Sequence, residues 1–390
     1  MKRTLYVLAL GIFGVATTEF GVIGILPQIA EAFNVTIDKA GWLLSSFALV
    51  IFLFAPVVTL FFVRFDRKKT LLLSLLFFVL SNILSALVNN FDLLLFAHLL
   101  PAFFHPVFWS IGLSTAASSV PKEQAPKAVS IVFGGFTIAS VLGIPMSTYI
   151  ADLFTWRAAF IMGAGINVVS FVGLLFFLPK ISSPAQSNSE TQLTILKRKS
   201  LWVRLALAFL MISAMYSSYG YFAGYLKDIT KMNGAEISLM LVLFGVAGVC
   251  GNWMAGKLLS KSIETTTLLF IISLCLIHVV IYFGAAYFIP MTLIVCLWGF
   301  INTGGFLISN VNVASQAPEA PEFVNSIFTS CGNLAVTAGT TIGGLVIAHA
   351  GIKQIVWAAI GLLLIALFTF FYAAVGKAKR ISMTIKQQPQ

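Results

Sequence analysis

Hydrophobic residues along this chain gather into twelve long runs separated by short polar stretches. The runs lie at about 5–26, 41–62, 70–88, 93–117, 127–150, 158–178, 202–225, 237–259, 266–288, 290–312, 323–348 and 353–375. Each is close to the ~20 residues that a helix needs to cross a hydrocarbon layer ~30 Å thick. The pattern therefore predicts an all-α membrane protein with twelve transmembrane helices.

One polar stretch, residues 179–204, is the longest break and has six runs on each side of it. We expect an N-terminal six-helix bundle over 1–178, a cytoplasmic linker over 179–201, a C-terminal six-helix bundle over 202–376 and a cytoplasmic tail over 377–390. The N-terminal run has the basic start of a signal peptide, but it is followed by eleven similar runs and is retained as the first membrane helix.

Composition and charge agree with a membrane location. Hydrophobic residues make up 59% of the chain and charged residues 9%, which is far outside the range of soluble domains. The net charge of +11 does not indicate nucleic acid, because most of the cations fall on one side of the membrane. If the N-terminus is cytoplasmic, the Lys and Arg residues on the outer side are only Lys39, Arg157, Lys227, Lys231 and Lys353. This bias predicts that both termini are cytoplasmic.

Candidate proton-coupling residues lie in the first and fourth runs. Glu19 is the only acid that we place at membrane depth, ~12 Å from the outer end of its helix at ~1.5 Å per residue. Buried carboxylates are costly in a membrane and typically carry protons or substrates, although a structural hydrogen bond is the alternative. His98 and His105 are seven residues apart, which predicts one helix face. A relay of Glu19 with a histidine is expected, and the sequence does not decide which one.

A second set of residues combines aromatic surfaces with amide or hydroxyl groups at membrane depth. Helices that face lipid rarely carry such groups, so we interpret them as the lining of a substrate cavity. With almost no fixed cation among them, they favour an uncharged or amphipathic small molecule. The candidate substrate-binding residues are Trp109, Tyr216, Tyr219, Trp298, Asn302 and Asn333.

Candidate gating residues lie at matching inner turns of the two halves and in the fifth helix. A basic turn follows the second helix, and the turn after the eighth helix echoes its spacing, which indicates an internal repeat of the kind that secondary transporters have. In the fifth helix, a glycine and a proline allow close packing and a bend. These candidates are Arg64, Arg67, Gly143, Pro145, Gly256 and Lys261.

The whole chain resembles the major facilitator superfamily, in particular its bacterial drug/proton antiporter branch of sugar-efflux, purine-efflux and multidrug exporters. The matching stretches are Thr18-Glu19-Phe20, Leu26 to Ala30, Arg64 to Lys69, Ala102 to His105, Phe108-Trp109-Ser110, Gly143-Ile144-Pro145, Trp156-Arg157, Gly251-Asn252 and Ala317 to Ala320. The histidine before Phe108 looks most like the sugar-efflux members.

This resemblance implies two pseudo-symmetric bundles with a cavity between helices one, four, seven and ten. It further implies a monomer without cofactors in the bacterial cytoplasmic membrane, which exports drugs or sugars by alternating access in exchange for protons. Export rather than import rests on the resemblance alone.

The chain departs from the family pattern at the inner turns. Thr59 and Val63 occupy the positions of the family's glycine and aspartate, and Ser260 occupies the second aspartate position. An ion pair built on those aspartates cannot form. The family's fourth-helix arginine falls on His98, which carries a positive charge only when protonated.

Other functions remain as alternatives. A sugar or nucleoside/purine transporter of the same fold with narrow specificity fits the same residues. A membrane-embedded enzyme is disfavoured because neither Gly-x-Ser-x-Gly nor His-Glu-x-x-His is present. A channel would need a filter or charged rings that the chain lacks. The four cysteines fall within predicted spans without zinc-site spacing, so no metal is expected.

Overall fold

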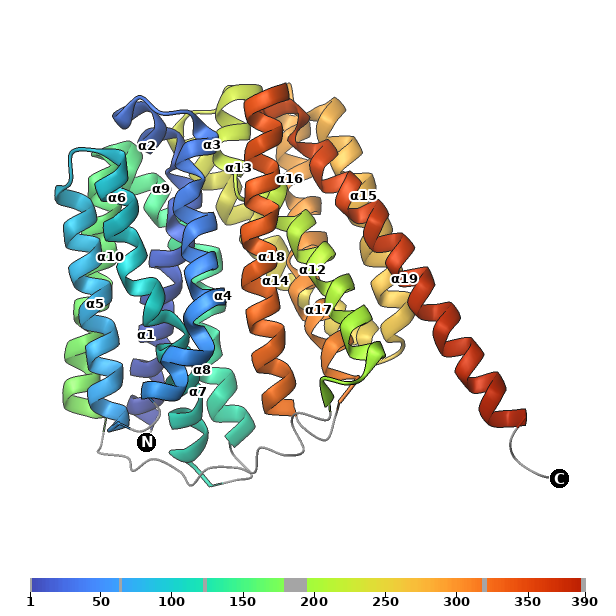
Figure 1. Ribbon diagram of the computed structural model, residues 1–390. Helices are drawn as coiled ribbons and strands as arrows, with labels where there is room; N and C mark the ends of the chain where they lie inside the picture. The colour runs from blue at the N-terminus through green and yellow to red at the C-terminus, as the bar shows by residue number, and fades with distance from the viewer. Residues whose placement is uncertain (1, 63–64, 122–124, 179–194, 318–320, 387–390) are drawn as a thin grey trace.

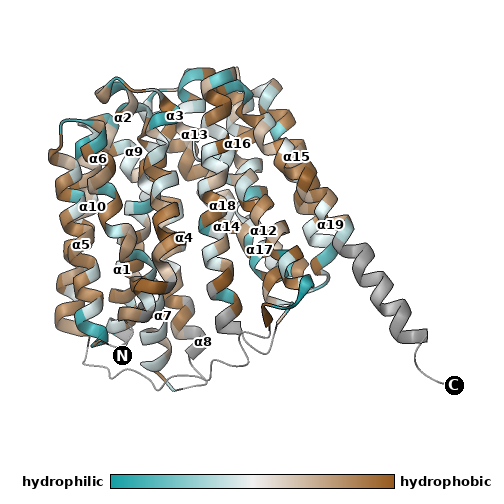
Figure 2. Ribbon diagram, in the orientation of Figure 1, coloured by the Kyte–Doolittle hydropathy of each residue, from teal (hydrophilic) through white to brown (hydrophobic). Residues whose placement is uncertain are grey.

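The computed structural model describes residues 2–62, 65–121, 125–178, 195–317 and 321–386, and these contain 12 helical spans long and apolar enough to cross a membrane. The prediction of twelve spans is confirmed. Hydrophobic residues follow the lengths of the spans and hydrophilic ones concentrate at their ends (Figure 2). Large apolar side chains are exposed on the outside of the bundle, where lipid would cover them, as with Phe176 and Phe368.

The first half runs from α1 to α10. Its elements are α1 (Lys2–Phe20), η1 (Gly21–Gly24), α2 (Leu26–Phe33), α3 (Ile37–Ala40), α4 (Trp42–Phe62), α5 (Arg67–Leu87), α6 (Phe91–Leu99), η2 (Leu100–Phe103), α7 (His105–Ser118), α8 (Ala125–Ile138), η4 (Ala139–Gly143), α9 (Ile144–Leu153) and α10 (Trp156–Phe177).

The second half runs from α12 to α19. Its elements are α12 (Lys199–Tyr219), α13 (Phe222–Tyr225), η5 (Leu226–Thr230), α14 (Gly234–Leu259), α15 (Ile263–Gly284), α16 (Phe288–Asn302), α17 (Gly304–Ala314), α18 (Pro321–Ala350), η6 (Ile352–Gln354) and α19 (Ile355–Lys386). Most of the expected linker lies outside the described residues, and α19 continues into the segment expected as a tail.

The two halves stand side by side, and both chain ends lie on the same side of the molecule (Figure 1). We call that side the terminal side and the other the distal side. The seventh span ends at Tyr219, six residues before its predicted end, because the chain breaks at Gly220 and Tyr221 before the short helix α13.

Spans one, four, seven and ten are all interrupted. In span one, η1 separates α1 from α2, and in span four, η2 with Pro101 separates α6 from α7. Span seven breaks at Gly220 and span ten at Thr303, before Gly304 and Gly305. Interruptions at corresponding positions of two halves free backbone groups and commonly mark the binding site of a transporter.

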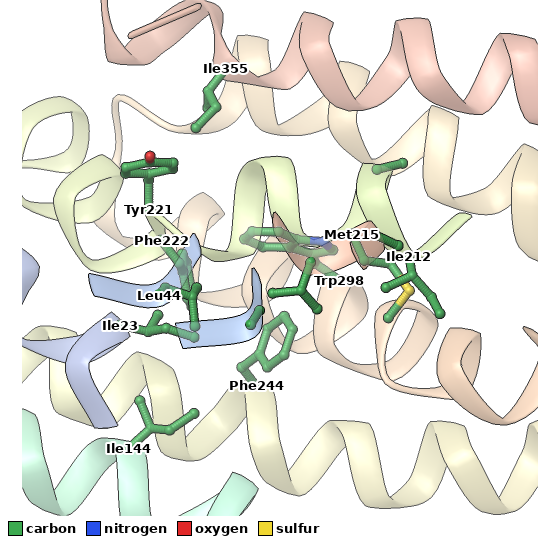
Figure 3. Close-up of a cluster of buried hydrophobic side chains, with 14 of the residues drawn as sticks. Ile23, Leu44, Ile144, Ile212, Met215, Tyr221, Phe222, Phe244, Trp298 and Ile355 are labelled. Atoms are coloured by element: carbon green, nitrogen blue, oxygen red, sulfur yellow. The ribbon is translucent and has the colours of Figure 1, made fainter. Parts of the chain in front are cut away.

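The apolar core joins the halves on the distal side only. A large buried cluster combines first-half residues such as Ile23, Leu44 and Ile144 with second-half residues such as Phe222 and Trp298 (Figure 3). A second cluster consists of first-half residues alone, mainly from the terminal-side parts of its helices. Among the described residues, the buried apolar core that the halves share therefore lies toward the distal side.

Polar contacts between the halves follow the same distribution. Between described residues, three connections cross from one half to the other: Ser238 Oγ donates to the Pro145 carbonyl at 2.9 Å, Thr337 Oγ1 donates to the Ser45 carbonyl at 3.1 Å, and Lys227 pairs with Glu31. The first lies between α14 and α9, the second between α18 and α4, and the ion pair caps the distal surface. Among the described residues, the side-chain hydrogen bonds and the ion pair between the halves thus lie toward the distal side.

Candidate functional site

The centre of the candidate site is a buried contact between a carboxyl group and an imidazole in the first half. Glu19, near the end of α1, is 5% exposed, and its Oε2 lies 2.8 Å from Nε2 of His105 at the start of α7. The interruption η1 begins two residues after Glu19, and η2 ends two residues before His105. The breaks in spans one and four thus lie beside the pair. The structure brings Glu19 together with His105, one of its two candidate partners.

Trp109 adds a third group to this pair. One turn along α7, its Nε1–H points at the same ring nitrogen, with 2.9 Å between Trp109 Nε1 and His105 Nε2. An imidazole nitrogen carries either a hydrogen or a lone pair. Nε2 can donate to the Glu19 carboxylate or accept from Trp109, but it cannot do both. The other ring nitrogen, Nδ1, is buried without a partner among the described residues.

His98 lies elsewhere in the same half. It is fully buried on α6 between the rings of Phe47, at 5.1 Å, and Phe160, at 6.0 Å, and neither ring nitrogen has a hydrogen-bond partner among the described residues. Phe47 also lies 6.0 Å from the ring of His105. The phenyl ring of Phe47 therefore contacts both histidines, and His98 forms no hydrogen bond with the described atoms of Glu19.

Amide side chains hold the helix turn that carries Glu19. Thr18 donates to the Gly14 carbonyl at 3.0 Å, and its hydroxyl oxygen accepts from Asn82 at 3.0 Å and from Asn167 at 3.2 Å. Both asparagines are completely buried. Spans one, three and six are thus tied together one residue from the carboxylate, which fixes its depth and direction.

Aromatic rings continue from this pair into the second half. Trp109 lies 5.6 Å from Phe136, Phe136 lies 6.1 Å from Phe20, and Phe20 lies 6.1 Å from Tyr216 across the boundary between the halves. Phe20 directly follows Glu19 in the chain, so the ring path begins at the Glu19–His105 pair. The last step, from Phe20 to Tyr216, connects the two halves at mid-depth.

In the second half, the rings form a compact box. Tyr219 is 6.2 Å from Tyr216, stacks on Phe244 at 4.8 Å and lies 6.4 Å from Trp298, which in turn contacts Phe222 at 4.8 Å. Four of the predicted substrate residues, counting Trp109, therefore belong to one connected set of rings. Such surfaces bind the apolar faces of organic molecules.

Polar atoms without partners adjoin the box. Trp298 Nε1 and Asn302 Oδ1, one helical turn apart on α16, are buried and have no hydrogen-bond partner among the described residues. Asn333 on α18 is partly exposed, and its amide donates to the Thr329 carbonyl of its own helix at 3.0 Å. The structure thus places a donor and an acceptor beside the box, while Asn333 lies apart from it.

The candidate gating residues do not form one cluster in the structure: some lie at the boundary between the halves and others lie within one half. Pro145 accepts the interhalf hydrogen bond from Ser238, and Gly143 ends the π-helical segment η4, where a Cβ atom would lie 2.4 Å from Thr17 Oγ1. These two lie where the halves meet. Arg67 instead contacts Ser118 within the first half, at 3.0 Å.

Of the remaining gating candidates, Arg64 lies outside the described residues. Gly256 is in the second half, and a Cβ atom there would make only an ordinary van der Waals contact, 3.9 Å from Leu307 of the same half. Lys261 is exposed in the turn after α14.

Sequence reasoning missed an ion pair in the second half. Arg204 on α12 is 6% exposed and donates to Glu264 at 2.5 Å and to Asn312 Oδ1 at 2.7 Å. It binds three helices together near the terminal side. The residues lie at predicted helix ends, where charge is ordinary, so the sequence carried no signal of the contact. No group of three or more His, Cys, Asp or Glu side chains suited to a metal occurs within the described residues.

Comparison with known proteins agrees with this architecture. The family model of the Major Facilitator Superfamily matches residues 8–339. The inner membrane transport protein YdhP of Escherichia coli (strain K12) is 33% identical over 343 residues, covering 88% of each chain. A protein named "Probable sugar efflux transporter" from Helicobacter pylori (strain P12) is 28% identical, covering 93% of each chain.

Solved structures share the fold at low sequence identity. The nucleoside transporter NupG superposes with a TM-score of 0.78 at 13% identity, covering 95% of this chain and 98% of its own. A bacterial homologue of the human lysosomal transporter Spinster gives 0.73, also at 13% identity, over 95% and 96% of the chains. With the family match over most of its length, this chain is a multi-pass membrane transporter, not an enzyme, and it belongs to the major facilitator superfamily.

Proposed function

We propose that this transporter exchanges protons for small organic molecules and exports them across the bacterial cytoplasmic membrane. The observation that carries the proposal is the buried Glu19–His105 pair, with Trp109 directed at the same ring nitrogen. A carboxylate and an imidazole in contact, away from bulk water, form a site that can take up and release a proton within one half of the molecule.

Glu19 and Trp109 compete for Nε2 of His105, and this competition links the protonation of the pair to the hydrogen bonds available in the substrate cavity. When Nε2 of His105 carries a hydrogen, it donates to the Glu19 carboxylate, and the Trp109 N–H is free to donate to a substrate. When Glu19 is protonated and Nε2 has a lone pair, Trp109 can donate to His105 instead. A change in proton occupancy therefore changes the hydrogen-bond donor that the first half offers to the ring-lined cavity.

The substrate class follows from the lining. Aromatic rings, the Trp298 N–H and the Asn302 carbonyl oxygen offer apolar faces and neutral hydrogen bonds, with no fixed cation among these described groups to attract an anion. Uncharged or amphipathic molecules, including sugars, suit this lining. The name of the Helicobacter pylori relative supports including sugars, whereas the NupG likeness concerns the fold alone.

Direction is proposed from charge and conformation together. The cation bias assigns the terminal side to the cytoplasm. Because the described contacts between the halves lie on the distal side, the proposed cycle loads substrate from the terminal side, and distal opening releases it outside. A transporter of the same fold with narrow specificity for a sugar or a nucleoside is the second candidate, and the choice of substrates in the assay separates it from a broad drug exporter.

The test is proton-gradient-driven uptake into inverted vesicles. The panel is a cationic dye, a tetracycline-type drug, arabinose and a purine nucleoside. Uptake of at least one compound should be abolished by an uncoupler and by Glu19→Gln, and retained in the matched control Glu236→Gln, because a glutamine oxygen can still accept the Asn233 backbone N–H at the start of that helix. Uptake that is driven by the gradient equally well in Glu19→Gln would refute the role of this pair.

Trp109→Phe removes the indole N–H donor and keeps an aromatic ring, so it tests the hydrogen bond apart from the ring contact. We expect the variant to keep gradient-driven uptake but to need about tenfold more substrate for half-maximal rate, because one hydrogen bond of about 1.4 kcal/mol is lost. An unchanged concentration dependence would show that the Trp109 N–H does not contact the substrate.

A further inference from the structure

Arg67 is a buried cation for which the described residues supply no carboxylate partner. It begins α5, is 5% exposed, and donates from Nη1 to Ser118 Oγ at 3.0 Å. No described carboxylate lies within ion-pair distance of it, and the neighbouring Asp66 accepts the backbone N–H of Lys69 instead. A guanidinium has five N–H donors, and the described residues account for one hydrogen bond, the one to Ser118.

A second buried arginine near the terminal side, Arg204, has the carboxylate partner that Arg67 lacks among the described residues. Arg204 is buried to the same degree in the second half, and it is paired with Glu264 and hydrogen-bonded to Asn312. The chain supplies a counter-ion in one half and, among the described residues, none in the other. Leaving a charge buried and unpaired is costly, so an external anion at Arg67 would be stabilising.

The side chain of Arg67 lines a small polar cavity that is open to solvent, because Ser110, Ser114 and Ser118 beside it are exposed. The cavity has a volume of about 30 Å³ and is lined by Arg67, Ser110, Ile111 and Ser114. Ser110, Ser114 and Ser118 are spaced four residues apart and lie on one face of α7. A space of this size exceeds the ~10–15 Å³ that one water needs. Hydroxyl donors and a guanidinium thus surround room for more than a single water.

We propose that this cavity binds an oxyanion, such as a phosphate group. The planar guanidinium donates to two oxygens of such a group in parallel, and the serine hydroxyls donate to others. The cavity lies where α5 begins, at the terminal-side end of a span, so a lipid headgroup of that leaflet and a free phosphate ion can both supply this chemistry. The site is independent of the proton-coupling pair and remains if that proposal fails.

The experiment measures the thermal unfolding midpoint of the full-length protein with two probes. The first is inorganic phosphate, titrated in neutral detergent at ionic strength held constant with sodium chloride. The second is phosphatidylglycerol, compared with phosphatidylcholine in nanodiscs. The midpoint of the wild type should rise in a saturable way with at least one probe.

The variants assign that rise to the cavity. Arg67→Gln should lose the response, and the double variant Ser110→Ala/Ser114→Ala, which keeps the arginine, should need about tenfold more probe. Ser119→Ala is the matched control, because its hydroxyl bonds the Ala116 carbonyl of its own helix, and it should respond as the wild type does.

The pattern of responses distinguishes the sources. A response to phosphatidylglycerol alone identifies a lipid headgroup, and a response to inorganic phosphate identifies a soluble ion; either supports the site. The proposal is overturned if neither probe raises the midpoint of the wild type, or if the double serine variant responds as strongly as the wild type.

Discussion

Removing two side-chain hydroxyls should open the distal side of this transporter. Ser238 donates to the Pro145 carbonyl at 2.9 Å, and Thr337 donates to the Ser45 carbonyl at 3.1 Å, each across the boundary between the halves. Ser238→Ala and Thr337→Val remove these donors and keep the shape of the side chains. The hydrogen bonds exist only while the halves are closed distally, so their loss acts on the conformational equilibrium.

The magnitude follows from the hydrogen bonds. The Ser238 bond is worth about 1 kcal/mol net, because water replaces the protein partner after opening. The Thr337 hydroxyl has one hydrogen, which it shares with the Asn333 carbonyl of its own helix at 3.0 Å, so its bond to Ser45 contributes only about 0.5 kcal/mol. The two bonds join different helix pairs, so together they contribute about 1.5 kcal/mol. The ratio of distally open to distally closed molecules should then rise about tenfold in the double variant, about fivefold in Ser238→Ala and about twofold in Thr337→Val.

Distances between spin labels on the distal surface measure this ratio. Labels are attached to cysteines introduced at Ala32 and Ala286, exposed positions of different halves, in a protein whose native cysteines are replaced by serine. Ser140→Ala is the control, because its hydroxyl donates to Phe136 of its own helix at 3.0 Å. If the double variant shifts the distance distribution no more than this control, the hydrogen bonds do not hold the distal side closed.

Two further predictions concern stability, measured as thermal unfolding in detergent. Gly135→Ala should lower the free energy of unfolding by about 1–3 kcal/mol through overpacking, because its Cβ would lie 2.0 Å from the Ala9 carbonyl oxygen. Gly134→Ala is the control: its Cβ meets open space, so the change should be nearly neutral. Equal unfolding midpoints for the two variants would contradict the packing of α1 on α8. Arg204→Gln should lower the free energy of unfolding by about 2–3 kcal/mol. This is less than the usual value for a fully buried ion pair, because the Glu264 side chain is 33% exposed. A decrease of less than about 0.5 kcal/mol would count against a stabilising role for the Arg204–Glu264 pair.

The sequence predicted the twelve spans and their halves because hydropathy depends only on local composition and length. It also identified Glu19, since a lone acid in an apolar run is conspicuous. It could not choose between His98 and His105, because the argument from seven-residue spacing assumes a continuous α-helix. The segment η2 interrupts the helix between them, and a 3₁₀ turn changes the angle per residue.

The ring partners of the predicted substrate residues were beyond sequence reasoning. Phe20, Phe136 and Phe244 carry no polar group, and they are three of 36 phenylalanines in the chain. Only tertiary packing separates those that contact Tyr216 or Trp109 from those that face lipid. The ion pair of Arg204 with Glu264 could not be predicted either, because the two residues are distant in the sequence and meet only through tertiary packing.

The two halves divide the proposed work unequally. The ionisable pair lies in the first half, while the second half contributes uncharged rings and amides to the cavity. Phe20 follows Glu19 in the chain and contacts Tyr216 of the other half, so a rearrangement at Glu19 on protonation, against the Asn82 and Asn167 bonds to Thr18, would also move this ring. A change of charge confined to one half can thereby alter its contact with the other at mid-depth. Phe20→Ala should then reduce gradient-driven uptake in the vesicle assay while leaving the Glu19–His105 pair in place, and uptake equal to that of the wild type would argue against this route.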